Sequence, residues 1–142
     1  MTREELICMV EDSVFSPLKW GRNDCAMLFA NVCKALSDGE CDPAKGLRGY
    51  RTPAGGIKKL KKAGYGSILE LARDMLQEIA PGEARDFDFG MVDIDELPKE
   101  RAIMTSPAVL IGANLFSLDE TGPVITERRT ATWFFRVPGR AV

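Results

Sequence analysis

The chain has 142 residues, 45% of them hydrophobic, and a formal charge of −2 from 19 Lys and Arg against 21 Asp and Glu. This composition is typical of one globular domain and excludes the charge-rich, apolar-poor class of disordered chains. No apolar run approaches the roughly 18 residues of a membrane span, and the acidic first segment does not have the basic and then apolar pattern of a signal peptide. We therefore expect a soluble protein made in the cytoplasm.

Histidine is absent from the sequence. Because imidazole is the most frequent general base and a common metal ligand, ordinary Ser-His and Cys-His hydrolases are disfavoured. Four cysteines without a secretory signal favour reduced thiols over a disulfide framework. We expect neither a metal nor another cofactor, since there is no Cys-x-x-Cys pair and Cys25 and Cys33 fall on one apolar helix face.

Helix signals open the chain. Thr2 and Glu5 have the spacing of a capping box and predict a helix over residues 3–13. Asn23 and Asp24 are good N-cap residues, and apolar residues recur after them at helical spacing. These apolar positions are Cys25, Leu28, Phe29, Val32, Cys33 and Leu36. They predict a second helix that is buried along this face.

Two further helices are expected before residue 80. Thr52 caps a third helix, which Gly64 ends. Ser67 caps a fourth, whose apolar stripe runs to Ile79 before Pro81-Gly82 stops it. The glycine pair Gly55-Gly56 inside the third helix costs helix stability and indicates either close approach of another backbone or a helix that begins later.

After Gly82 the pattern changes to short apolar runs bounded by Gly, Pro, Asp or Asn, which is typical of strands. The expected strands cover residues 89–94, 108–111, 114–118, 124–126 and 132–137. Helices followed by strands predict an α+β fold in which N-terminal helices pack on a small C-terminal antiparallel sheet. We expect a single domain over residues 1–142, with a helical half at 1–80 and a strand-rich half at 83–138.

The charges are unevenly distributed. Residues 43–62 hold seven basic and no acidic side chains, whereas residues 63–100 hold ten acidic and three basic ones. One interpretation is a set of solvated helix faces, and the other is a charged contact with a protein partner. The partner interpretation makes the basic stretch and the acidic segment 83–100 candidate binding surfaces. The candidate binding lysines are Lys58, Lys59, Lys61 and Lys62. Binding of nucleic acid is disfavoured by the acidic total and by the few aromatic residues near the lysines.

The string from Trp20 to Cys25, Trp-Gly-Arg-Asn-Asp-Cys, is the most informative in the sequence. Cys25 falls in the first turn of a helix, where unpaired amides and the helix dipole favour a thiolate. Asp24 places a negative charge beside the sulfur, and Cys25 also belongs to the apolar face. Spacing alone therefore favours a structural cysteine over a nucleophile.

This string resembles the nucleophile segment of the NlpC/P60 cysteine peptidases, which have a papain-like fold. A closer resemblance is to small phage and prophage proteins related to them, in which Trp-Gly-x-Asn-Asp-Cys precedes a loop ending Arg-Gly-x-Tyr, a helix and a Trp-containing last strand. Here these are Arg48-Gly49-Tyr50, which lacks the spacer, residues 52–63, and residues 133–137. The resemblance implies an NlpC/P60-like α+β domain in the virion, at the tail tip or baseplate. It also implies hub and distal tail proteins as partners, no membrane, and a homo-oligomer or ring as an open possibility.

The catalytic parts of the peptidases have no match here. Their second half opens with a Gly-Asp turn and supplies a base from a His-Val-Gly-Ile strand, whereas this chain has residues 89–92 and 106–112 at these places, with Ala108 or a near neighbour at the histidine position. A thiol with a pKa of about 8.5 and no base is only a few per cent ionised at neutral pH. The resemblance therefore implies an inactive scaffold in which Cys25, with Asp24, is a vestigial site. The alternative is a peptidoglycan hydrolase that uses Cys25 with a carboxylate or amine base.

Three other residues are candidates for binding. Trp20 is expected to anchor the core together with Trp133, and sugar stacking is the alternative for Trp20. Arg48 and Tyr50 lie in an expected irregular loop over residues 41–51, where a structural role and a role at a protein interface are both open. A third functional possibility is a small cytosolic module that binds an acidic partner through the lysines of residues 58–62.

Overall fold

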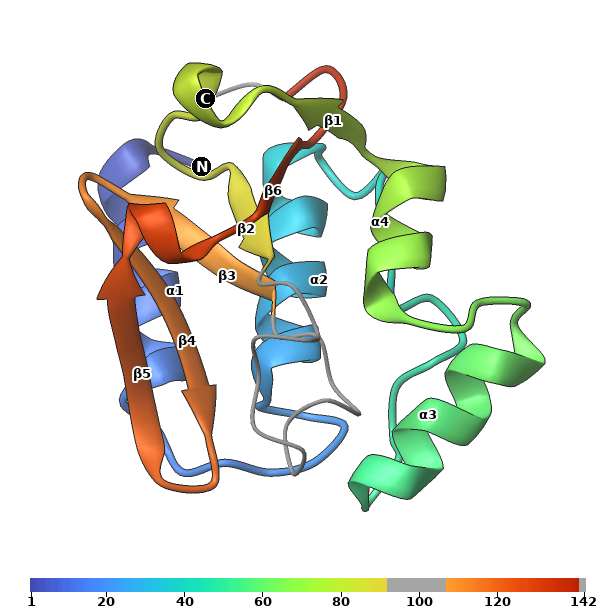
Figure 1. The fold of residues 1–142 in the computed structure, drawn as a ribbon. Helices are drawn as coiled ribbons and strands as arrows, with labels where there is room; N and C mark the ends of the chain where they lie inside the picture. The colour runs from blue at the N-terminus through green and yellow to red at the C-terminus, as the bar shows by residue number, and fades with distance from the viewer. Residues whose placement is uncertain (92–106, 141–142) are drawn as a thin grey trace.

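The computed structural model describes residues 1–91 and 107–140, which form four α-helices, two short 3₁₀ helices and one six-stranded antiparallel sheet (Figure 1). The α-helices are α1 (Arg3–Val14), α2 (Cys25–Leu36), α3 (Pro53–Lys62) and α4 (Ile68–Met75), and the 3₁₀ helices are η1 (Pro81–Glu83) and η3 (Arg128–Thr130). The strands are β1 (Gln77–Ile79), β2 (Phe89–Met91), β3 (Pro107–Ile111), β4 (Asn114–Asp119), β5 (Gly122–Glu127) and β6 (Trp133–Arg136). The expected α+β class is therefore confirmed.

Helix α1 begins at the capping box that the sequence predicts. The Thr2 hydroxyl accepts a hydrogen bond from the Glu5 amide, and the Glu5 carboxylate accepts one from the Thr2 amide, each at 3.2 Å. Leu6, Val10 and Val14 form its buried face. Each such side chain contributes on the order of 2 kcal/mol by leaving water, so this face fixes α1 against the rest of the core.

Both faces of the sheet carry apolar side chains. Helices α1 and α2 pack on the face that contains Val109 and Phe135, and the ring of Phe29 in α2 meets Phe89 edge to face at 4.8 Å. The other face carries Leu110 and Phe134 in a smaller cluster. The side chains alternate between the two faces because successive residues of a strand point to opposite sides.

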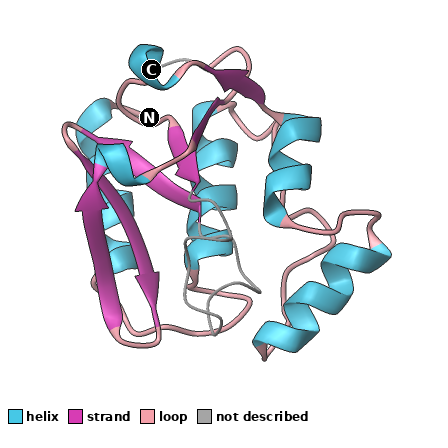
Figure 2. Ribbon diagram, viewed as in Figure 1, coloured by secondary structure: helices cyan, strands magenta, loops and turns pink. Residues whose placement is uncertain are grey.

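The strand order is β1-β6-β2-β3-β4-β5. Strand β6 therefore lies inside the sheet, between β1 and β2. Figure 1 labels these strands, and Figure 2 shows the strands of the sheet in magenta in the same view. The expected strands of the C-terminal half are confirmed within the described residues. The part of the first one that covers residues 92–94 lies outside them, as does half of the acidic segment 83–100, namely residues 92–100.

The expected continuation of the fourth helix to Ile79 is wrong. Leu76 adopts an extended conformation with φ −116° and ψ 169°, and the next three residues form β1, with Gln77 opposite Arg136 and Ile79 opposite Phe134. Ile79 is buried in the cluster on the second face of the sheet. Pairing with β6 and this burial together outweigh the helical spacing of Ile79, so the helical half ends at Met75 and the sheet takes in one strand from it.

None of the helices among the described residues is long and apolar enough to cross a membrane.

Candidate functional site

The turn that leads into α2 is held by backbone and side-chain hydrogen bonds. Lys19 and Asn23 exchange two backbone hydrogen bonds of 2.9 and 2.8 Å. The Asn23 amide oxygen accepts from the Ser13 hydroxyl at 2.6 Å, and its nitrogen donates to the carbonyl oxygens of Ser13 and Pro17 at 3.0 and 3.1 Å. Asn23 therefore ties the end of α1 to the beginning of α2.

Asp24 is fully buried at the N-terminus of α2, and three donors reach its carboxylate. Oδ1 accepts from the Met27 amide at 2.8 Å, which is the N-cap hydrogen bond. Oδ2 accepts from the Gly21 amide at 2.8 Å and from the Tyr50 hydroxyl at 2.6 Å. A buried carboxylate is stable only when it is hydrogen-bonded in this way, so the role of Asp24 is to join the turn, the helix and the loop that carries Tyr50.

Tyr50 is buried against two glycines. Burial and the Asp24 carboxylate raise the pKa of its hydroxyl far above the ordinary value, so it stays a hydrogen-bond donor. A Cβ on Gly21 would lie 2.1 Å from the Tyr50 carbonyl oxygen, and a Cβ on Gly56 would lie 3.1 Å from the Tyr50 ring. The expected close approach at Gly55-Gly56 is thus made by a tyrosine ring and not by a backbone, because α3 lies across the side chain of Tyr50.

Cys25 occupies the first turn of α2, as the sequence predicts, and its side chain is only 3% exposed. On β3, Ala108 packs with the cluster on the second face of the sheet, whereas Val109 packs in the main cluster with α2.

All four cysteines are thiols and none is in a disulfide. Burial raises the pKa of Cys33 well above its ordinary value, and a hydrogen bond with Cys41 acts in the same direction. The same contact lowers the pKa of the partly exposed Cys41. Among the described residues, no cluster of three or more Cys, Asp or Glu side chains could hold a metal ion.

Arg48 is engaged within its own loop. Its guanidinium donates two hydrogen bonds, of 2.8 and 2.9 Å, to the Asp42 carboxylate, and it lies 3.4 Å from the Asn31 amide oxygen. The Arg48 carbonyl oxygen accepts a hydrogen bond of 2.9 Å from Lys59 Nζ. Arg48 and Lys59 thus connect the loop of residues 41–51 to α2 and α3, and neither cation is directed entirely at solvent.

Both tryptophans lie at the edge of the core and are partly buried. Trp20 packs against the small cluster that contains Met27 and Tyr50. Trp133 packs against the main cluster, and the Arg73 guanidinium lies 5.3 Å from the centre of its ring. Each tryptophan thus packs against a core cluster while remaining partly exposed.

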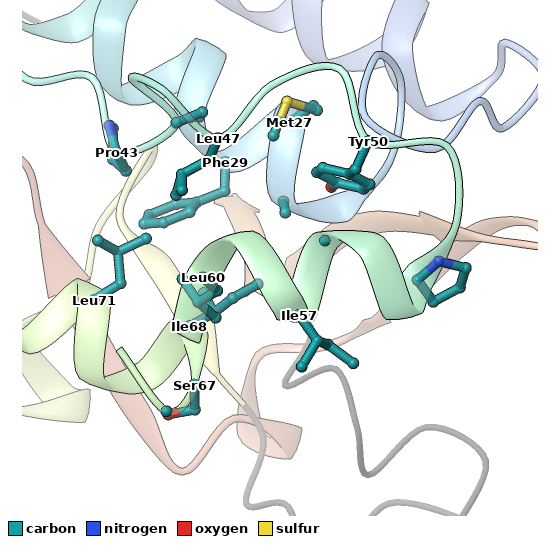
Figure 3. A pocket seen from close by; sticks show the side chains of 16 residues that line it. Met27, Phe29, Pro43, Leu47, Tyr50, Ile57, Leu60, Ser67, Ile68 and Leu71 are labelled. Atoms are coloured by element: carbon teal, nitrogen blue, oxygen red, sulfur yellow. The ribbon is translucent and has the colours of Figure 1, made fainter. Parts of the chain in front are cut away.

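An apolar pocket of about 70 Å³ lies between α2, the loop of residues 43–50, α3 and α4 (Figure 3). Its lining consists of Ala26, Met27, Phe29, Ala30, Pro43, Ala44, Leu47, Tyr50, Pro53, Gly56, Ile57, Leu60, Gly66, Ser67, Ile68 and Leu71. Lys58, Lys61 and Lys62 are exposed on α3, which forms one wall. The sequence indicates the lysines, but the pocket follows from how three separate segments are placed around α2.

A buried charge cluster at the other end of the sheet has no counterpart in the sequence-based expectations. Asp88 is fully buried and accepts hydrogen bonds from Arg136 at 2.8 and 3.0 Å, from Arg140 at 2.9 Å and from the Arg85 amide at 2.8 Å. These arginines hold the end of the chain against β2. Because the partners lie about 50 residues apart, no local motif identifies them.

In a comparison with known families, a family model described as "Domain of unknown function (DUF6950)" matches residues 2–137. A search of curated proteins finds no match.

Proposed function

The chain belongs to the DUF6950 family, and we propose from its residues that the protein is a non-catalytic scaffold with an NlpC/P60-like architecture in the tail tip or baseplate of a phage virion. The likeness to the peptidases is supported by Asp24-Cys25 at the first turn of a helix that packs on an antiparallel sheet. The phage assignment is supported by the order of the Trp-Gly-x-Asn-Asp-Cys string, the Arg48-Gly49-Tyr50 loop and the last strand.

The observation that carries the proposal is the commitment of Asp24. Its carboxylate receives three hydrogen bonds from groups that the fold itself needs to place, the Met27 and Gly21 amides and the Tyr50 hydroxyl. These hydrogen bonds satisfy a carboxylate that is otherwise costly to bury, so they give Asp24 a structural role within the string.

The state of Cys25 agrees with this role. Its side chain is 3% exposed, and the sequence has no histidine to take the thiol proton or to protonate a leaving amine. Free cysteine is among the residue types most often buried, where it behaves as a small apolar side chain. Cys25 therefore contributes packing at the start of α2.

Contact with hub and distal tail proteins is assigned to the exposed face of α3. Lys58, Lys61 and Lys62 are accessible there, whereas Tyr50 is buried and Arg48 is paired with Asp42. Charged surfaces of this kind steer and orient a partner of opposite charge. The binding roles suggested for Arg48 and Tyr50 thus become roles in holding the loop that supports α3.

Localisation tests the tail proposal. In particles of a phage that encodes this chain, cryo-electron microscopy is expected to place it at the tail tip, and mass spectrometry is expected to find it in purified virions. Particles that are complete and infectious without the chain would overturn the proposal. A Cys25→Ser phage is expected to assemble and infect normally.

A digestion assay tests the alternative enzyme. Purified wild-type protein and Cys25→Ser are each incubated with peptidoglycan, and released muropeptides are separated and weighed by mass spectrometry. We expect no products from either protein. Products that are formed by the wild type and abolished by Cys25→Ser would establish a cysteine hydrolase and overturn the non-catalytic scaffold.

A further inference from the structure

The pocket beside α3 is small and mainly apolar. Its volume is about 70 Å³, whereas a dry apolar cavity that holds a benzene molecule has about 150 Å³. A depression of this volume accommodates an aliphatic side chain more readily than an aromatic ring. Figure 3 shows the pocket extending from Tyr50 at one end to Pro43 and Leu71 at the other.

The few polar groups at the pocket are already engaged. The Tyr50 hydroxyl donates to Asp24 at 2.6 Å, and the Ser67 hydroxyl accepts from the Glu70 amide at 3.2 Å as the N-cap of α4. A sugar or another polar ligand needs several convergent donors and acceptors to offset its lost hydration. The lining therefore selects a hydrocarbon group.

The loop before α3 and helix α3 itself carry positive charge beside this pocket, while the Glu70 carboxylate accepts a hydrogen bond from the Gly66 amide at the α4 side. Lys58, Lys61 and Lys62 are exposed on α3, and Lys45 and Arg51 are exposed on the loop before it. Residues 43–62 contain no carboxylate to neutralise them. Lysines near the C-terminus of a helix also offset its dipole, but that effect does not explain the cations outside α3.

Helix α3 is also the least buried helix among those described. It has no buried residue, and Ile57 and Leu60 are only partly covered although they line the pocket. An apolar depression surrounded by accessible charge is the usual form of an anchor site in a protein interface. Nucleic acid fits this surface less well, because Tyr50 is buried and Tyr65 alone of the two tyrosines near the lysines is accessible for stacking.

We infer that the face formed by α3 and this pocket binds an acidic segment of a partner protein, which inserts one aliphatic side chain between α2 and α3. The carboxylates of the segment would meet the exposed lysines, and its aliphatic side chain would fill the pocket. The identity of the partner as a tail protein rests on the proposed function. The chemistry of the segment rests only on the charge and shape of this face.

Designed peptides test the inference. Five fluorescein-labelled peptides of ten residues are used. Four have an acidic sequence of Asp, Glu and Ser around a central Ala, Val, Leu or Phe. The fifth has a neutral sequence around a central Leu. Their binding to the full chain is measured by fluorescence anisotropy at 50 mM salt. We expect the acidic Leu or Val peptide to bind at least tenfold more tightly than the acidic Ala, acidic Phe and neutral Leu peptides.

Protein variants assign the binding to this face. The double variant Lys61→Glu, Lys62→Glu is expected to lower the affinity for the acidic Leu peptide at least tenfold. The control Lys19→Glu, Lys34→Glu changes the net charge equally at exposed positions elsewhere, and we expect it to change this affinity less than twofold. Ala30→Leu fills the pocket and is expected to remove the preference for Leu over Ala. Leu60→Ala, at a partly exposed position, enlarges the pocket and is expected to admit the Phe peptide, which keeps the test decisive if Ala30→Leu does not fold.

Three outcomes overturn the inference. They are no binding of any peptide at 1 mM, binding that does not depend on the central residue, and equal competition by a single-stranded DNA oligomer of the same charge. If the chain instead forms a dimer that Lys61→Glu with Lys62→Glu dissociates, the occupant of this face is a second copy of the chain and not a partner protein. Because none of these assays uses a virion, their failure is distinguishable from absence of the protein from the tail tip.

Discussion

The hydroxyl of Tyr50 donates a hydrogen bond of 2.6 Å to Asp24, across 26 positions of sequence, and both groups are buried. The same carboxylate caps α2, so one side chain fixes the beginning of the central helix and the loop that supports α3. The stability of the fold and the shape of the pocket therefore depend on the same contact.

Removing the Tyr50 hydroxyl tests this dependence. Tyr50→Phe keeps the ring against Gly56 but takes one donor from a buried carboxylate, and we expect the free energy of unfolding to fall by about 1.5 to 3 kcal/mol. Urea titration of the purified protein measures the change. Tyr65→Phe is the matched control, because its hydroxyl bonds Asp74 at the surface, and we expect no measurable effect. Equal losses for the two variants would contradict the importance of the buried contact.

Gly21 is expected to be irreplaceable for a steric reason. Its φ is +77°, and a Cβ there would lie 2.1 Å from the Tyr50 carbonyl oxygen, a backbone atom that cannot move alone. Gly46 has nearly the same φ of +79° but open space around it. We expect Gly46→Ala to cost about 1 kcal/mol in unfolding free energy, from the left-handed conformation alone. Gly21→Ala is expected to cost more than about 4 kcal/mol or to prevent folding. If Gly21→Ala and Gly46→Ala have similar midpoints of thermal unfolding, the close contact of Gly21 with Tyr50 does not determine the cost of the substitution.

The buried cluster around Asp88 predicts a large loss of stability on substitution. Asp88→Ala leaves the guanidinium groups of Arg136 and Arg140 without their shared carboxylate, which we expect to lower the free energy of unfolding by about 3 to 5 kcal/mol. Glu127→Ala removes an exposed ion pair with Arg129 and is expected to cost less than about 1 kcal/mol. Chemical denaturation of both variants under identical conditions measures the two losses of unfolding free energy, so that they can be compared. A small effect of Asp88→Ala would mean that the cluster is not a stabilising element.

The Asp42–Arg48 pair predicts a defined pH dependence. The hydrogen bonds from Arg48 lower the pKa of Asp42 below its ordinary value. The stabilisation from the ionised carboxylate is therefore fully present above the unfolded-state pKa of about 3.9 and is lost as the pH falls through the lower folded-state pKa. Arg48→Ala is expected to be less stable than the wild type above pH 5, and the difference is expected to shrink below pH 4.

Unfolding free energies between pH 7 and pH 2.5 measure this difference. Lys45→Ala, a substitution at an exposed position of the same loop, serves as the control. We expect it to shift the plot of unfolding free energy against pH as a whole, without changing its shape. A difference between Arg48→Ala and wild type that stays constant down to pH 2.5 would exclude the Asp42 carboxylate as its source.

The cysteines are expected to differ in reactivity. Cys8 is exposed, and Cys41 is partly exposed with a lowered pKa, so both are expected to react first. Cys33, which is buried with a raised pKa, and Cys25, which is 3% exposed, are expected to be alkylated last by iodoacetamide in the folded protein. Peptide mapping by mass spectrometry follows each site over time. Rapid labelling of Cys25 below neutral pH would support the hydrolase alternative instead.

Local patterns in the sequence were enough to predict the first three α-helices, the beginning of the fourth, and the strands after Gly82. Capping residues such as Thr2, Asp24 and Thr52 act on amides two or three positions away, so their effect is visible within a short window. The exception is β1. The spacing of Ile79 fits a helix, but this segment forms a strand because it pairs with β6, which lies far along the chain. The absence of histidine is likewise a property of the sequence alone.

The tertiary structure decided what the motif residues do. Nothing near Asp24 in the sequence indicates that Tyr50 completes its hydrogen bonds, and nothing near Gly56 indicates that the same tyrosine ring lies against it. The pocket and the Asp88 cluster are also made by segments that meet only after folding. Their energies come from burial and from contacts between distant residues, which depend on how the chain packs and not on the identity of its neighbours in sequence.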